Sequence, residues 1–198
     1  MDAILRLATE ADAGPIQAIY APFCGDSTVS FEVVPPTREE MADRIRAVTA
    51  RYPWLVCESG GVVLGYAYAS RHRERAAYRW SVDASVYVRE DARGWGVGRA
   101  LYAALFEILR LQGFYRVFAG ITLPNPASVG LHRSAGFAPV GTFHNAGFKC
   151  GAWRDVQWWE RALQPPAEHP VEPVDVAAVS RLPAWDAALA LCPPDPRT

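Results

Sequence analysis

The spacing of hydrophobic and polar residues predicts alternating strands and helices over residues 3–163. Short apolar runs rich in β-branched and aromatic residues indicate strands, and apolar residues at helical spacing, as at Leu101 and Leu105, indicate helices. Thr9 and Thr37 are each followed three residues later by an acidic residue, a capping pattern that predicts where two helices begin. The predicted strands are residues 3–8, 54–58, 62–70, 80–88, 115–121, 137–143 and 156–161, and the predicted helices are residues 9–20, 37–50, 98–112 and 126–135.

The predicted order, β-α-α-β-β-β-α-β-α-β-β, indicates an α/β protein (mixed-sheet α+β) with helices flanking one central mixed sheet. From Gln164 the periodicity is lost and prolines become frequent. We therefore expect a domain over residues 1–163 and a proline-rich tail over residues 164–198, with one short helix near Trp185.

The composition is that of an ordinary globular protein, with 51% hydrophobic and 21% charged residues. The formal net charge of −1 argues against nucleic acid as a partner, because binding a phosphate backbone needs a cationic excess. The four cysteines lack C-x-x-C spacing, so we expect no metal site and no disulfide framework. Without a signal-peptide pattern or a long apolar stretch, we expect a cytoplasmic protein that does not enter a membrane.

A strand at residues 85–88 leads into glycines at alternate positions, Gly94, Gly96 and Gly98, and then into a helix. Glycines let the backbone turn with its N–H groups inward, and the helix N-terminus favours an anion there, so the segment predicts a pyrophosphate site. Arg99 stands where a dinucleotide fingerprint needs glycine, and no G-K-[ST] follows, which argues against both nucleotide motifs.

The remaining pattern, R-x-x-G-x-G at Arg93, Gly96 and Gly98, resembles the acetyl-CoA loop of the GNAT superfamily of N-acetyltransferases. The resemblance implies the GNAT fold and acetyl-CoA as acetyl donor. It also implies that the strand before the loop lends backbone groups to the pantetheine arm. The residues implied in binding acetyl-CoA are Val86, Tyr87, Val88, Arg93, Gly94, Gly96, Val97, Gly98, Arg99, Asn125 and Ser128.

A second motif, N-x-x-S-x-x-L-H-x-x-x-G-F from Asn125, resembles another signature of the superfamily. Its Asn125 and Ser128 are implied near the pantetheine. His132 stands where many members have tyrosine, a position implied to protonate the CoA thiolate, and an imidazole titrates in the right range for this role. The alternative is a helix histidine satisfied by a nearby carbonyl.

Three further segments, 28–31, 73–88 and 146–156, resemble the phosphinothricin and methionine sulfoximine acetyltransferase branch, with G-F-K-x-G-x-W-x-D the most specific run. The resemblance implies that basic residues before the central strand receive the acidic groups of the substrate. An arginine can hold a carboxylate or phosphinate with two hydrogen bonds. Without this resemblance, the charged run at residues 71–75 is interpreted as a solvated loop. The implied substrate-binding residues are Phe31, Arg73, Arg75 and Tyr78.

Asp83 stands where the branch places a glutamate as general base. The shorter side chain keeps the carboxylate, and we expect proton removal through a water; the alternative is a strand-edge carboxylate without a catalytic role. The predicted reaction is direct transfer of acetyl to the α-amine of an amino acid resembling phosphinothricin or methionine sulfoximine or sulfone. Acetylation of another small primary amine, and a weakened acyl-CoA-binding sensor, remain alternatives.

The seven tryptophans, notably Trp153, Trp158 and Trp159, offer more aromatic area than a monomer surface is expected to carry. The resembling branch forms homodimers in which residues around the G-F-K-x-G loop of one subunit approach the active site of the other. We therefore expect a homodimer.

Overall fold

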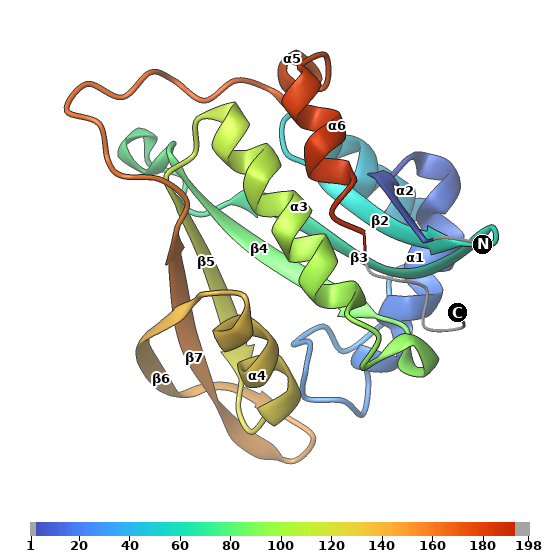
Figure 1. Ribbon diagram of the computed structural model, residues 1–198. Helices are drawn as coiled ribbons and strands as arrows, with labels where there is room; N and C mark the ends of the chain where they lie inside the picture. The colour runs from blue at the N-terminus through green and yellow to red at the C-terminus, as the bar shows by residue number, and fades with distance from the viewer. Residues whose placement is uncertain (1–2, 193–198) are drawn as a thin grey trace.

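The computed structural model describes residues 3–192, and a seven-stranded sheet of order β1-β2-β3-β4-β5-β7-β6 forms its centre (Figure 1). All neighbouring strands are antiparallel except β4 and β5. The strands are β1 (Ile4–Leu7), β2 (Trp54–Ser59), β3 (Val62–Arg71), β4 (Ser81–Val88), β5 (Arg116–Thr122), β6 (Ala138–Lys149) and β7 (Ala152–Ala162). The α-helices are α1 (Ala13–Tyr20), α2 (Arg38–Thr49), α3 (Val97–Gln112), α4 (Pro126–Ser134), α5 (Val176–Val179) and α6 (Pro183–Leu189), and the 3-10 turns are η1 (Glu10–Asp12), η2 (Ala21–Phe23), η3 (Ala76–Tyr78) and η4 (Glu90–Ala92).

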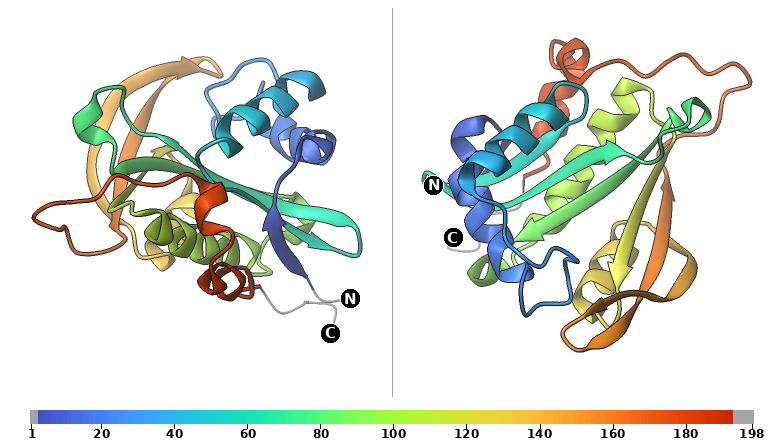
Figure 2. Two further views of the ribbon diagram at one scale, coloured as in Figure 1. Left: turned by 90° about the horizontal axis from the view of Figure 1, so that it is seen from above. Right: turned by 180° about the vertical axis from the view of Figure 1, so that it is seen from behind.

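Helices cover both faces of the sheet, as the α/β pattern predicts (Figure 2). α1 and α2 pack on one face around Met41, Ile45 and Trp54, and α3 packs on the other. The apolar stripe of α3 is buried along its length, and the helix ends at Gly113, whose φ of 94° is the left-handed conformation that favours glycine. None of the helices within residues 3–192 is long and apolar enough to cross a membrane.

The last hairpin is longer than predicted. Strands β6 and β7 continue through the G-F-K-x-G-x-W-x-D segment to a two-residue turn at Cys150 and Gly151, with φ of 53° and 72°. Positive φ at both positions is typical of turns whose twist matches that of the flanking strands. Glycines within the segment hide the strand pattern, but cross-strand pairing from Gly147 to Lys149 continues the ladder.

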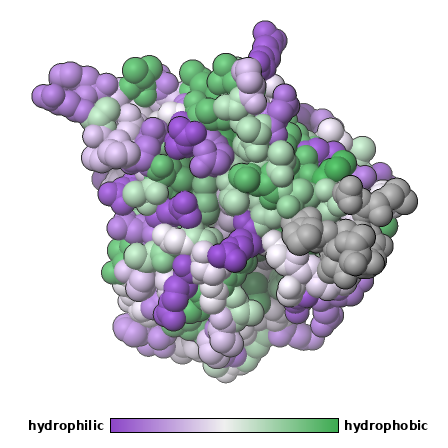
Figure 3. All heavy atoms as spheres, viewed as in Figure 1, coloured by the Kyte–Doolittle hydropathy of each residue, from purple (hydrophilic) through white to green (hydrophobic). Residues whose placement is uncertain are grey.

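The segment predicted as a tail packs against the domain. α5 and α6 cover α3, and Trp185 is buried in the same core as the residues of α3. The side chain of Gln112 donates to the backbone carbonyl of Val174, which ties the segment to the end of α3. In Figure 3, hydrophobic and hydrophilic residues are intermixed across this face. The core therefore extends beyond residue 163, whereas residues 1–2 and 193–198, the outer ends of the two predicted segments, lie outside the described part.

The sheet opens between β4 and β5. These two strands pair only from Ser81 with Arg116 to Asp83 with Phe118, and beyond Asp83 they separate. β4 stays paired with β3 on its other edge as far as Val88. A fork therefore begins at Asp83.

Candidate active site

The fork opens into a cavity of about 400 Å³. Its walls are the end of β4, the glycine loop, the start of α3 and the start of α4. All eleven residues predicted to bind acetyl-CoA line it. They are Val86, Tyr87, Val88, Arg93, Gly94, Gly96, Val97, Gly98, Arg99, Asn125 and Ser128.

The glycine loop has the geometry of an anion site. Gly94 and Gly96 have φ of 81° and 82°, which only glycine adopts without strain. The first hydrogen bond of α3 runs from the N–H of Ala100 to the carbonyl of Gly96, so the N–H groups of the first turn have no intrahelical partner. These donors, with the positive end of a 16-residue helix, suit a pyrophosphate.

Gly98 has a different role, close approach between elements. A Cβ at this position would lie 3.1 Å from Cδ2 of Leu131 and 3.5 Å from Cγ2 of Val88. The missing side chain therefore lets α3, α4 and β4 meet at the cavity wall.

The edge of β4 that faces the fork is available for an extended ligand. Beyond Asp83, no described strand pairs with this edge. Backbone N–H and C=O groups need partners when they are buried, and a pantetheine arm lying along residues 84–88 would supply them as an added strand does. The residues present therefore fit acetyl-CoA.

Asn125 and Ser128 both border the cavity at the start of α4. The side chain of Asn125 caps the helix by accepting a hydrogen bond from the N–H of Ser128, at 3.1 Å. The cap fixes the direction in which α4 leaves β5, and so the shape of this wall.

The resemblance implies that His132 protonates the CoA thiolate, but His132 is not among the residues that line the cavity. The ring is 5% exposed, its Nδ1 donates to the carbonyl of Ser128 at 2.8 Å, and its Nε2 accepts from the hydroxyl of Tyr102 at 2.9 Å. Burial lowers the pKa of His132, so the ring is neutral near pH 7. The structure thus favours the alternative interpretation, a histidine satisfied within the fold. Ser128, whose Oγ lies 3.2 Å from Nδ1 of His132, does line the cavity.

Asp83 lies where β4 and β5 separate, and its carboxylate is not alone. Oδ1 lies 2.6 Å from Nδ1 of His72, the residue directly after β3. Burial raises the pKa of Asp83 above its usual range, while the hydrogen bond from His72 and the charge of Arg73 oppose that rise. Sequence reasoning missed His72, because the pairing of β3 with β4 is what brings residues 72 and 83 together.

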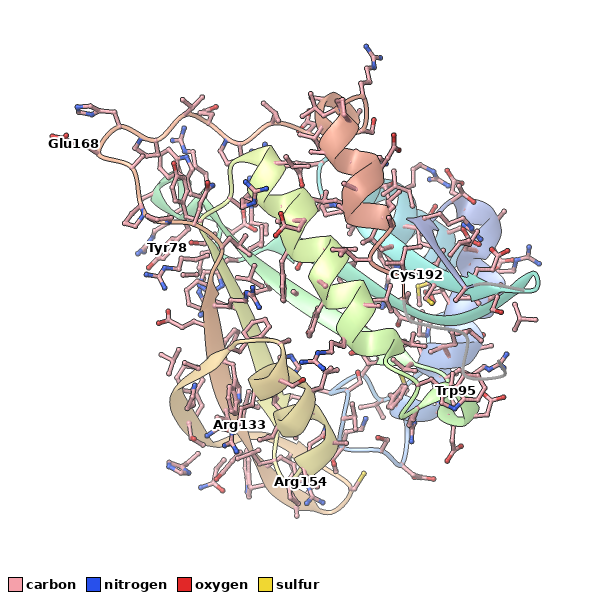
Figure 4. All side chains as sticks on the ribbon, viewed as in Figure 1. Tyr78, Trp95, Arg133, Arg154, Glu168 and Cys192 are labelled. Atoms are coloured by element: carbon pink, nitrogen blue, oxygen red, sulfur yellow. The ribbon has the colours of Figure 1, made fainter. Side chains whose placement is uncertain are left out.

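The predicted substrate residues lie around this pair to different degrees. The ring of Tyr78 contacts the ring of His72 edge-on, and the guanidinium of Arg73 lies 5.7 Å from the ring centre of Trp158, which also contacts His72. Arg75 is exposed at the start of η3. In Figure 4, Tyr78 lies beyond the start of β4, and Trp95, in the glycine loop, lies beyond its other end. The loop of residues 71–75 and the glycine loop therefore lie at opposite ends of β4.

Phe31 lies on the loop between η2 and α2, which is fixed by a residue from another element. Nζ of Lys149 on β6 donates to the backbone carbonyls of Ser30 at 2.6 Å and Glu32 at 2.7 Å. The ring of Phe31 packs on Gly147, where an added Cβ would come within 2.5 Å of it. Lys149 and Gly147 belong to the G-F-K run, so this motif positions Phe31 within the same subunit.

A second cavity, of about 250 Å³, lies on the α1 and α2 face of the sheet. Tyr68 and Ser70 of β3 line it together with Arg44 of α2. Ser70 is the cross-strand partner of Asp83, so the cavity borders the start of the fork. None of these residues was predicted as a site residue. Tyr66, Tyr68 and Ser70 stand at every second position of β3 and so share one face of the sheet, a pattern that could have indicated a partly polar cavity wall.

Comparison with known proteins identifies the family. The acetyltransferase (GNAT) domain family matches residues 5–158. The chain belongs to the GNAT acetyltransferases. It is 42% identical to the phosphinothricin N-acetyltransferase of Streptomyces viridochromogenes over 171 residues, which cover 86% of this chain and 93% of that protein. It is 38% identical over 175 residues to the L-methionine sulfoximine/L-methionine sulfone acetyltransferase of Pseudomonas aeruginosa strain PAO1, covering 86% of this chain and all of that one.

Among solved structures, a GNAT superfamily phosphinothricin acetyltransferase from Sinorhizobium meliloti, in complex with acetyl-CoA, is similar with a TM-score of 0.82 and 39% identity. The match covers 88% of this chain and 96% of that one. The predicted family, GNAT fold and acetyl-CoA-dependent acetyltransferase class are confirmed by these comparisons.

Proposed function

We propose that this GNAT enzyme acetylates the α-amine of small amino acids that carry a second polar or anionic group, as phosphinothricin and methionine sulfoximine or sulfone do. The fork carries this proposal. In the fork, the carboxylate of Asp83 lies at the start of an unpaired strand edge suited to an acyl-pantetheine, and the cross-strand partner of Asp83, Ser70, lines the second cavity. The matches to phosphinothricin and methionine sulfoximine acetyltransferases support the substrate class.

In the proposed reaction the amine nitrogen attacks the thioester carbonyl; a C–N bond forms and the C–S bond breaks. The basic centre at Asp83 removes a proton from the ammonium group, directly or through a water. Backbone N–H groups of β4 polarise the carbonyl. The hydroxyl of Ser128, which borders the cavity, donates a hydrogen bond to the departing sulfur in place of His132.

Arg73 and Arg75 supply the cations for the anionic groups of the substrate, and Tyr78 and Phe31 shape the walls. All four are exposed in this structure, so an incoming amino acid reaches them without displacing a core residue. A guanidinium is suited to a carboxylate or phosphinate because it can form two parallel hydrogen bonds.

The test is acetylation by the full chain of phosphinothricin, L-methionine sulfoximine and L-methionine sulfone, compared with a polyamine and a neutral amino acid. Because Cys150 is exposed and would react with a thiol reagent, the acetylated product is measured by mass spectrometry. We expect the first three to be preferred, and Asp83→Asn to lower turnover by about 10²- to 10⁴-fold. Preference for the polyamine would refute the substrate class, and acetyl-CoA binding without any product would favour the sensor alternative.

The homodimer also belongs to this proposal. Two aromatic side chains of the outer hairpin, Phe148 and Trp153, are 63% and 61% exposed and contact each other. Phe143 and Val140 of the same hairpin are also exposed. Of the tryptophans expected at an interface, Trp159 is instead buried in the core. The exposed hairpin is the face that a second subunit would cover. Phe148→Glu should shift the mass in sedimentation from dimer to monomer.

We also propose that the enzyme is located in the cytoplasm.

A further inference from the structure

His72 and Asp83 form a contact of the kind that prepares a histidine to accept a proton. Nδ1 of His72 lies 2.6 Å from Oδ1 of Asp83. A carboxylate accepts hydrogen bonds, so Nδ1 carries the hydrogen and the lone pair of the neutral ring is on Nε2. Within residues 3–192, no hydrogen bond to Nε2 is present. The nitrogen that can accept a proton is therefore free to do so.

The ring is held in place by aromatic neighbours. It stacks on Phe118 of β5 with ring centres 4.2 Å apart, and contacts Tyr78 and Trp158 edge-on. The side chain of His72 is only 9% exposed, whereas that of Asp83 is 29% exposed. An imidazole packed this way keeps one orientation, which general-base catalysis requires.

We propose that His72 and Asp83 act together as the base, with Nε2 of His72 receiving the proton of the substrate amine. The N–H bond of the ammonium breaks, an N–H bond forms on Nε2, and the electron pair left on the amine attacks the acetyl carbon. As the C–S bond breaks, the nitrogen loses a second proton to the departing thiolate, so the products are the amide and the free thiol. Asp83 is then the positioning residue: it holds the ring and stabilises the imidazolium that forms. The proton leaves to water after product release.

This proposal rests on the proposed function and deepens it. An aspartate has one methylene less reach than a glutamate, and a histidine between carboxylate and substrate supplies the missing length. The groups that face the ring are Asp83 of β4, Tyr78 of η3, Phe118 of β5 and Trp158 of β7, with Arg73 as the nearby cation. Asp83 is the only carboxylate among them, so it is the group that stabilises the charged ring.

Two substitutions separate the role of His72 from that of Asp83. His72→Gln retains an amide N–H that can donate to Asp83 but cannot accept the proton; His72→Phe retains the stacking on Phe118 alone. We expect both to lower kcat by about 10²- to 10⁴-fold at pH 8, as loss of a general base does, with the dissociation constant for acetyl-CoA unchanged. We expect the rate of the parent to fall toward acid pH, and this loss should be absent from the residual activity of both variants.

His169→Gln is the matched control, because His169 is exposed and distant in sequence from the site. Equal unfolding midpoints and acetyl-CoA affinities in all variants show that the fold and the donor site are intact. If His72→Gln keeps kcat within threefold of the parent with the same pH profile, the proposal is overturned and Asp83 accepts the proton itself. If the parent acetylates no amine, the proposed function has failed, and that result is obtained before any His72 variant is measured.

Discussion

Lys149 is the only lysine in the sequence, and its substitution tests how the G-F-K segment supports the site. The side chain is 6% exposed, and its ammonium donates to the carbonyls of Ser30 and Glu32 on the loop that carries Phe31. Lys149→Met keeps the length and removes the charge and both hydrogen bonds. We expect a less stable protein with a loosened loop.

The magnitude follows from the two contacts. A hydrogen bond to a charged group contributes about 1.5–3 kcal/mol. The carbonyl of Ser30 belongs to a buried residue and loses its partner, whereas Glu32 is half-buried and its carbonyl regains water. Methionine also avoids the cost of burying an ammonium group, which offsets part of the loss. The free energy of unfolding should therefore fall by about 2–4 kcal/mol.

Urea unfolding measures this difference, with Arg44→Met as the matched control. Arg44 holds the same loop through Glu32, at 2.7 and 3.1 Å, but this ion pair is exposed and should contribute about 0–1 kcal/mol. Acetic anhydride gives an independent check, because the native chain should protect Lys149 and the unfolded chain should not. A loss for Lys149→Met no larger than that for Arg44→Met would refute the reasoning.

Three further predictions follow from the site. Gly98→Val should weaken acetyl-CoA binding in calorimetry and also lower the free energy of unfolding by about 1–3 kcal/mol, because the new side chain meets Leu131; unchanged stability would show that α4 yields freely. Arg75→Ala should raise the KM for an anionic amino acid about 10-fold or more, leaving that for acetyl-CoA unchanged; equal effects on both would contradict a substrate role. His132 has a lowered folded pKa, so the unfolded chain binds more protons below about pH 6.5 and the parent loses stability as the pH falls through that value. His132→Gln should lack this part of the loss in urea unfolding between pH 8 and 5.

Several features of this protein follow from local sequence alone. The helix starts at Thr9 and Thr37, the glycine loop and the capped start of α4 at Asn125 depend on residues within four positions of each other. Backbone conformation and capping act over this range, so the pattern of side chains is sufficient to predict them. The order of strands and helices was predictable for the same reason.

Two features were not predictable from local sequence: the full length of the last hairpin and the packing of the proline-rich segment. Strands β6 and β7 extend through glycines that weaken the strand pattern, because pairing with a neighbour outweighs local preference. The proline-rich segment lacks periodicity, yet the side chain of Trp185 is buried in the core against α3. Both outcomes depend on surfaces that exist only after the sheet has formed.

The chemistry of the candidate base was decided by tertiary structure. Asp83 and His132 were the acid–base candidates of the sequence, but the fold brings His72 to Asp83 across the β3–β4 pair and buries His132 against Tyr102. The fork at Asp83 likewise depends on where pairing between β4 and β5 stops. The protonation and reach of each group depend on its burial and on its hydrogen bonds to residues far away in the chain. These contacts cannot be deduced from the spacing of residues in the sequence.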